Sequence, residues 1–140
     1  MRKASEDSYE KFYQNLAHLF YAVAMADGII RKEEKHMLHR MVKEEWLNPD
    51  GSTDEYGTDA AYEIETVFDL LEVHNITSEQ AFAGFENYYH ANSDLFDEAV
   101  TGKIIHTAHR IASSFHQKNK SEHTVLTKIH FMLGHANAAH

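Results

Sequence analysis

The sequence predicts an all-α fold, a compact bundle of about six or seven helices. Apolar residues recur at helical steps of three and four along most of the chain. No segment alternates apolar and polar residues for long enough to indicate a strand. One proline and six glycines in 140 residues leave few interruptions. A chain of this length can bury one sizeable core, so residues 1–140 are expected to form a single domain.

The first two helices are expected over about residues 6–26 and 32–46. The first should end at the Asp27-Gly28 turn, since glycine readily adopts the left-handed conformation of a helix end. Its apolar stripe consists of Tyr9, Phe12, Tyr13, Leu16, Leu19, Phe20, Val23 and Ala24. The residues of the second helix that should face inward are Met37, Leu38, Met41 and Val42.

The middle of the chain begins with a turn signal at residues 48–51, and the polar stretch through Gly57 is expected to be the main loop. A third helix over about 58–72 should then follow. Thr77 and Gln80 have the spacing of a capping box, which would start a fourth helix. The buried residues expected from these two helices are Ile64, Val67, Phe68, Leu71, Phe82, Phe85 and Tyr89.

Two helices complete the prediction. Ser93 would cap a fifth helix running to about His116, and Ser121 would cap the last one. Residues from about 134 to 140 are small and polar and are expected to form a flexible tail. The inward residues would be Phe96, Val100, Ile104, Ile105, Ala108, Ile111, Val125, Leu126, Ile129 and Met132.

Composition excludes several classes of function. The formal net charge of −9 opposes binding to nucleic-acid phosphates and to anionic membrane surfaces. The chain has no cysteine, which excludes disulfides, thiolate zinc sites and cysteine nucleophiles. The longest apolar run, residues 19–26, is far shorter than the ~20 residues of a membrane span. The start of the chain lacks the apolar region of a signal peptide, so a cytoplasmic location is expected.

Twelve histidines give the chain a charge that should change markedly near neutral pH. Two pairs, His36 with His39 and His106 with His109, share a helix face and could chelate a transition ion. Surface histidines at this spacing also arise by composition alone, which is the simpler explanation.

A weak internal repeat relates the two halves of the chain at a shift of 88 positions. It aligns Leu16 with Ile104 and Glu34 with Glu122, among other pairs. Few of the aligned residues are identical, and amphipathic helices align partly by chance. The repeat indicates a pseudo-twofold relation between the halves.

The segment from residue 19 to residue 38, LFYAVAMADGIIRKEEKHML, carries the most specific pattern. An apolar helix ends in Ala-Asp-Gly, and Glu33-Glu34 opens the next helix. This pattern resembles the signature of the TerB-like family, named after a tellurite-resistance protein; DnaJ-like membrane co-chaperones carry a related module. The resemblance implies a helical bundle with a pseudo-twofold repeat and an acidic cluster that binds a divalent metal between two copies of the motif.

Five residues are candidates for such a metal site. Asp27, Glu33 and Glu34 match the first copy of the motif, and Glu122 matches the glutamate of the second. The second Asp-Gly is missing, and His116 stands close to its place, which would favour zinc or another transition ion over calcium. The alternative explanation for Glu33 and Glu34 is a local one without a metal: carboxylates in the first turn interact favourably with the helix dipole and stabilise the helix.

No pattern predicts a reaction, because the chain lacks a nucleophile elbow and a phosphate-binding glycine loop. We therefore expect a non-enzymatic TerB-like module, related to stress and metal-oxyanion resistance, that binds a partner protein and a divalent cation. The alternative is a metal-dependent hydrolase or resistance enzyme that uses the same cluster. The identities of the ion and the partner, and self-association into a homo-oligomer, stay open.

Overall fold

The computed structural model describes residues 5–26, 30–46, 55–115 and 120–134. Across these ranges the fold is all-α, as predicted, with six α-helices and no strand. The helices are α1 (Ser5–Ala24), α2 (Lys32–Trp46), α3 (Glu55–Val73), α4 (Ser78–Ala91), α5 (Glu98–Phe115) and α6 (Lys120–Ile129). A 3₁₀ turn, η1 (Ser93–Leu95), precedes α5, and a π-helical turn, η2 (His130–Gly134), follows α6.

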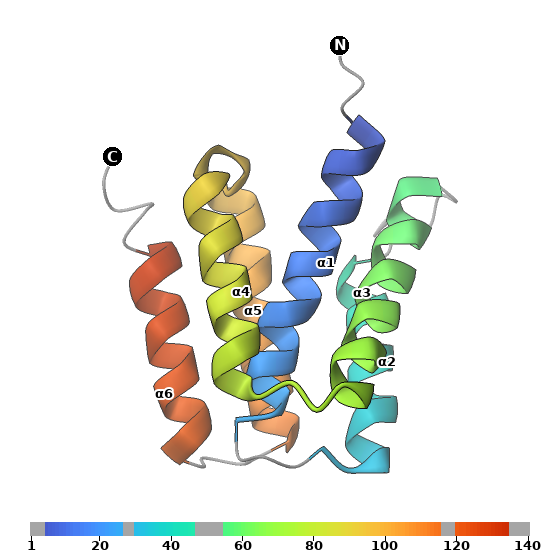
Figure 1. The fold of residues 1–140 in the computed structure, drawn as a ribbon, viewed down its shortest axis with the longest axis vertical. Coiled ribbons are helices and arrows are strands. Elements are labelled where there is room, and N and C mark those ends of the chain that lie inside the picture. The colour runs from blue at the N-terminus through green and yellow to red at the C-terminus, as the bar shows by residue number, and fades with distance from the viewer. Residues whose placement is uncertain (1–4, 27–29, 47–54, 116–119, 135–140) are drawn as a thin grey trace.

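Helix α1 lies at the centre of the bundle (Figure 1). It packs against α3, α4, α5 and α6, whereas α2 packs against α3 and α5. The sequence explains this position, because every residue from Leu19 to Ala24 is fully buried. A helix that is apolar on all sides is stable only when neighbours cover it completely. Most of the longest apolar run of the chain, Leu19 to Ala24, is therefore the part of α1 that the other helices enclose. No described helix has the length and apolarity that crossing a bilayer requires.

Aromatic rings fill the core between α1, α4 and the start of α5. Phe96 is 5% exposed, and its ring lies 5.5 Å from Phe12, 5.7 Å from Phe85 and 5.0 Å from Tyr89, measured between centroids. The prediction that Ser93 caps a helix carrying Phe96 is wrong. The backbone turns at η1 so that Phe96 inserts between these rings, and α5 begins only at Glu98. Asp97 caps it, since its Oδ1 accepts a hydrogen bond from the Val100 amide at 2.9 Å.

Other predicted features also differ from the structure. Ser121 was expected to cap the last helix, but α6 already begins at Lys120, so Ser121 lies inside its first turn. Met37 was expected inside but is 37% exposed, because α2 turns Leu38, Met41, Val42 and Trp46 toward the core instead. The predicted loop through Gly57 is also too long, because α3 already begins at Glu55. The capping box at the start of α4 is confirmed. Thr77 Oγ1 accepts from the Gln80 amide at 3.0 Å, and Gln80 Oε1 accepts from the Thr77 amide at 2.9 Å.

The shift of 88 positions relates α1 to α5 more closely than α2 to α6. The aligned pairs Leu16 and Ile104, and Val23 and Ile111, are fully buried in both helices. Further along, exposed Met37 aligns with buried Val125. The buried faces of α2 and α6 thus begin at different positions of the repeat. The pseudo-twofold relation of the two halves stays a prediction.

Candidate functional site

The first turn of α2 holds two of the five predicted metal ligands. Glu34 Oε1 accepts a hydrogen bond from the Arg31 amide at 2.8 Å, and Oε2 lies 3.8 Å from Nη1 of the same arginine. Glu34 is the third residue of α2, so its carboxylate forms one half of a capping box, the bond from the N3 side chain back to the amide before the helix. Glu33 beside it is exposed.

The other three predicted ligands cannot be placed around this turn. Asp27 and His116 lie outside the described residues, and only the backbone of Glu122 is described, in α6. Within the described ranges, no three His, Asp or Glu side chains are arranged to hold a metal ion. The five-residue metal site therefore stays a prediction. The contact that the structure does show for Glu34 is a local one, at the start of α2.

The α2–α3 interface is polar and rich in carboxylates. Lys35 Nζ lies 2.7 Å from Glu72 Oε1 and 3.5 Å from Asp69 Oδ1. His39 Nε2 lies 3.4 Å from Asp69 Oδ1, and its Nδ1 lies 3.8 Å from Glu65 Oε1. Hydrogen bonding to Glu72 raises the pKa of Lys35, against the effect of burial. Three carboxylates thus face one lysine and one histidine, so acidic groups outnumber basic ones at this interface.

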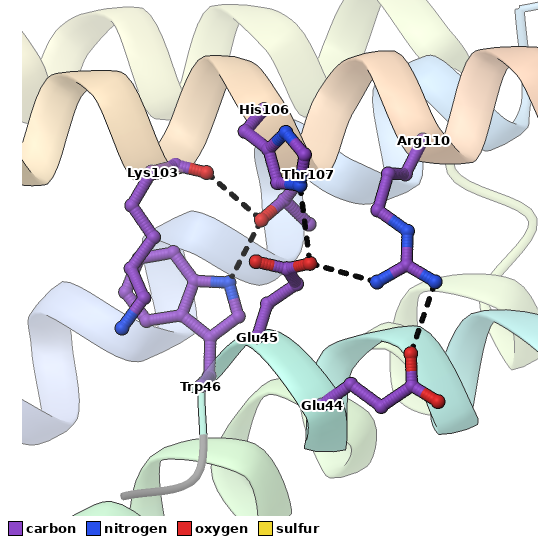
Figure 2. Close-up of polar contacts among 7 residues, drawn as sticks. All are labelled: Glu44, Glu45, Trp46, Lys103, His106, Thr107 and Arg110. Carbon is purple, nitrogen blue, oxygen red and sulfur yellow. Dashed lines mark hydrogen bonds and ion pairs between the residues drawn. The ribbon is translucent and has the colours of Figure 1, made fainter. Parts of the chain in front are cut away.

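The α2–α5 interface centres on Arg110, whose guanidinium spans two neighbouring carboxylates (Figure 2). Its Nη1 donates to Glu45 Oε2 at 2.7 Å, and its Nη2 donates to Glu44 Oε1 at 3.0 Å. His106 Nε2 lies 3.3 Å from the same Glu45 oxygen. Hydrogen bonding to Glu45 and then to Glu44 raises the pKa of Arg110. This arrangement fixes α2 against α5. The Glu45 carboxylate is bound by Arg110 and His106, whereas a carboxylate acting as a general base would have to be free to accept a proton from a substrate.

A groove runs between α4 and the last helical segment of the chain. Its volume is about 350 Å³. Apolar side chains line it from both sides, with charged residues among them. The lining residues are Glu79, Phe82, Ala83 and Glu86 of α4, Lys128 of α6, and Phe131 and Met132 of η2. Phe131 is 72% exposed. Lys128 Nζ lies 5.4 Å from the centroid of the Phe82 ring, which ties the two walls together.

The outer face of α3 is a second exposed apolar surface. Tyr62, Leu70 and Val73 are 69%, 51% and 72% exposed. They follow one another along one side of the helix. In Figure 1, α3 lies at the opposite side of the bundle from α6, so this face and the groove are separate surfaces.

Two features of this region were not predicted from the sequence. The groove joins α4 with residues almost fifty positions later, and no sequence signal connects them. His109 was grouped with His106 of its own helix, but its ring contacts His130 of η2, with 2.7 Å between the two Nε2 atoms. The contact between His109 and His130 depends on how α5 and η2 pack against each other, and residue spacing along one helix cannot reveal this packing.

Comparison of the chain with models of protein families, with curated proteins and with solved structures gave no match. The TerB-like resemblance therefore rests on residues 19–38 and on the weak repeat alone.

Proposed function

We propose that this chain is a non-enzymatic helical module that binds a partner protein, and that the partner presents a basic amphipathic helix to the groove between α4 and η2. The observation that carries the proposal is the groove itself. Its volume of about 350 Å³ is within the range of binding pockets, and its walls combine aromatic and aliphatic side chains with charged groups. A helix laid in a hydrophobic groove is a common way to recognise a partner.

The charges around the groove favour a cationic helix. Glu79 and Glu86 are seven residues apart, so both lie on the same side of α4, about two turns from each other. Two basic residues on a partner helix at the same spacing would complement them. The net charge of −9 would also speed association with a cationic partner. Lys128 on the other wall would orient the partner, because it pairs with an acidic residue and disfavours a basic one.

The described charged clusters support binding over catalysis. At the α2–α3 and α2–α5 interfaces the carboxylates are paired with Lys35, His39, His106 and Arg110 on adjacent helices. Such pairs stabilise helix packing. A metal-dependent hydrolase would need an open coordination position beside a substrate cleft. The TerB-like resemblance adds the context of tellurite resistance and stress response, with a divalent cation bound by Asp27, Glu33, Glu34, His116 and Glu122.

The test uses Ala83→Arg, which places a long cationic side chain in the groove from an exposed helical position. Ala91→Arg is the matched control, because it makes the same change at an exposed position of α4 that does not line the groove. The probe is a labelled synthetic helix with leucines at positions i, i+4 and i+7 and two lysines seven residues apart. Its binding is followed by fluorescence anisotropy, beside a peptide with the lysines replaced by glutamates.

The expected result is saturable binding of the cationic peptide, weakened about tenfold or more by Ala83→Arg and unchanged by Ala91→Arg. The proposal is overturned by absence of binding up to about 1 mM peptide, or by equal binding to the two variants. A third variant, Leu70→Arg, tests the outer face of α3. Loss of binding there, with the groove variant unaffected, would also contradict the proposal.

A further inference from the structure

His109 of α5 and His130 of η2 bring two imidazole nitrogens unusually close together. Their Nε2 atoms are 2.7 Å apart, the ring centroids are 5.0 Å apart, and the ring planes meet at 66°. The contact joins residues 21 positions apart, so it is formed by tertiary packing. His130 is also the first residue of the π-helical turn. Single π-helical turns occur often at functional sites, where the wider turn places a side chain that a regular helix would direct elsewhere.

Only one proton fits between two nitrogens at this separation, so at least one of the two atoms presents a lone pair. Two charged rings would repel each other. Partial burial lowers the pKa of His109, and the neighbouring His130 and His106 lower it further. The uncharged imidazole is the form that ligates metals.

The geometry is close to that of a two-histidine chelate. Metal–nitrogen bonds of about 2.0–2.1 Å with angles between square-planar and tetrahedral place the donors about 2.9–3.3 Å apart. The two Nε2 atoms would have to separate by a few tenths of an ångström to reach this distance. Both residues are exposed, so small rotations about their side-chain bonds can supply the change. An ion would replace the shared proton and would leave its other positions to water.

We propose that His109 and His130 form a binding site for one late transition-metal ion, such as Cu²⁺, Ni²⁺ or Zn²⁺, that links α5 to η2. Nitrogen donors favour these ions over Ca²⁺ and Mg²⁺. The site differs in position and in donor atoms from the acidic set predicted around Glu34. His106 lies one turn before His109, but its Nε2 is 3.3 Å from Glu45 Oε2, and this contact keeps it with α2.

The experiment measures binding of Ni²⁺, Cu²⁺ and Zn²⁺ to the full untagged chain by calorimetry, after removal of metal with a chelator. Four variants are compared with the parent: His109→Asn, His130→Asn, His90→Asn and Glu34→Gln. His90 is the matched control, since it is an exposed histidine whose contact is with Glu86 on its own helix. Thermal unfolding in the presence of chelator confirms that each variant folds.

The expected result is one binding event whose affinity falls about tenfold or more in His109→Asn and in His130→Asn. The His90 variant should bind as the parent does. An ion at the acidic set around Glu34 would appear as a separate event, so in Glu34→Gln the event that depends on the two histidines should persist. Electron paramagnetic resonance of the Cu²⁺ form should show two equatorial imidazole nitrogens in the parent and one in either site variant. The proposal is overturned if both site variants bind like the parent, if the His90 variant loses as much affinity, or if Glu34→Gln abolishes binding.

Discussion

The indole of Trp46, at the last residue of α2, donates a hydrogen bond from Nε1 to Thr107 Oγ1 of α5 at 3.2 Å. The threonine hydroxyl in turn donates to the Lys103 carbonyl oxygen at 2.9 Å. Thr107 is fully buried and Trp46 is 8% exposed, so water cannot replace either bond easily. Lys103 Nζ lies 4.8 Å from the indole centroid (Figure 2). The end of α2 is thus fixed to α5 by one side chain that has both apolar and polar contacts.

Replacing Thr107 by valine should destabilise the protein although the volume barely changes. The indole N–H would stay buried without an acceptor, which costs about 1–3 kcal/mol of unfolding free energy. Thr107→Ser keeps the hydroxyl and serves as the control. Urea unfolding followed by the fluorescence of the only tryptophan measures both variants. A valine variant as stable as the parent would show that the hydrogen bond contributes nothing net.

Removal of Lys35 should expose the excess of negative charge at the α2–α3 interface. In Lys35→Met the carboxylates of Glu72 and Asp69 lose the lysine cation, and Glu65 faces His39 of the same interface. Since the side chains of Lys35, Glu72 and Asp69 are roughly two-thirds buried or less, the loss should be about 1–3 kcal/mol. Lys43→Met, at an exposed position of the same helix, should change stability by less than about 0.5 kcal/mol.

Adding Glu72→Gln to the Lys35 variant tests the cause of this loss. The second change removes one of the uncompensated charges, so it should restore part of the stability. If the double variant were less stable than Lys35→Met alone, packing of the lysine stem and not its charge would explain the effect.

Two helical glycines should respond differently to alanine. A Cβ at Gly102 would meet no atom within 4 Å, so Gly102→Ala should stabilise the protein by about 0.5–1 kcal/mol through helix propensity. A Cβ at Gly84 would lie 3.1 Å from His18 Cδ2, and that ring is held by a 2.9 Å contact between its Nδ1 and the Gln14 carbonyl. The gain from Gly84→Ala should therefore be smaller or negative. Chemical denaturation of the two variants measures the difference, and equal gains would mean that α1 and α4 separate easily.

Tyr21 should make folding stability fall at alkaline pH. Its hydroxyl is buried and donates to the Ile76 carbonyl at 2.8 Å; burial, and secondarily the Glu72 charge, raise the pKa of this phenol. A raised pKa in the folded state means that the unfolded chain loses its proton first. The contribution to stability is complete below the ordinary value of about 10 and is lost as the pH rises toward the folded-state pKa.

Tyr21→Phe separates this effect from the other alkaline titrations. At pH 7 the variant should be about 1 kcal/mol less stable, because the hydrogen bond to Ile76 is lost. Between pH 9 and 11 it should lose less stability than the parent. Lys35, Tyr88 and Tyr89, whose pKa values are also raised in the folded protein, contribute to the pH dependence of both proteins alike. Parallel pH profiles for the two proteins would contradict the assignment.

Helix type and number followed from the sequence because periodicity and caps are local signals. The Thr77 capping box and the buried stripe of α1 are examples. The sequence placed Phe96 inside correctly but not in a turn before α5, and it placed Met37 inside wrongly, since both depend on which rings and helices surround them. Pairing His109 with His130, and α4 with η2 around the groove, likewise required the tertiary packing. Of the candidate metal ligands, the structure adds a capping contact for Glu34, and binding stays to be measured.

The central position of α1 has a consequence for how the protein is made. A ribosome completes α1 before any of the helices that cover it, and α5 follows more than seventy residues later. The enclosed run from Leu19 to Ala24 must therefore wait in the nascent chain without its partners. Contacts between segments so distant in sequence slow folding and leave apolar surface open to aggregation.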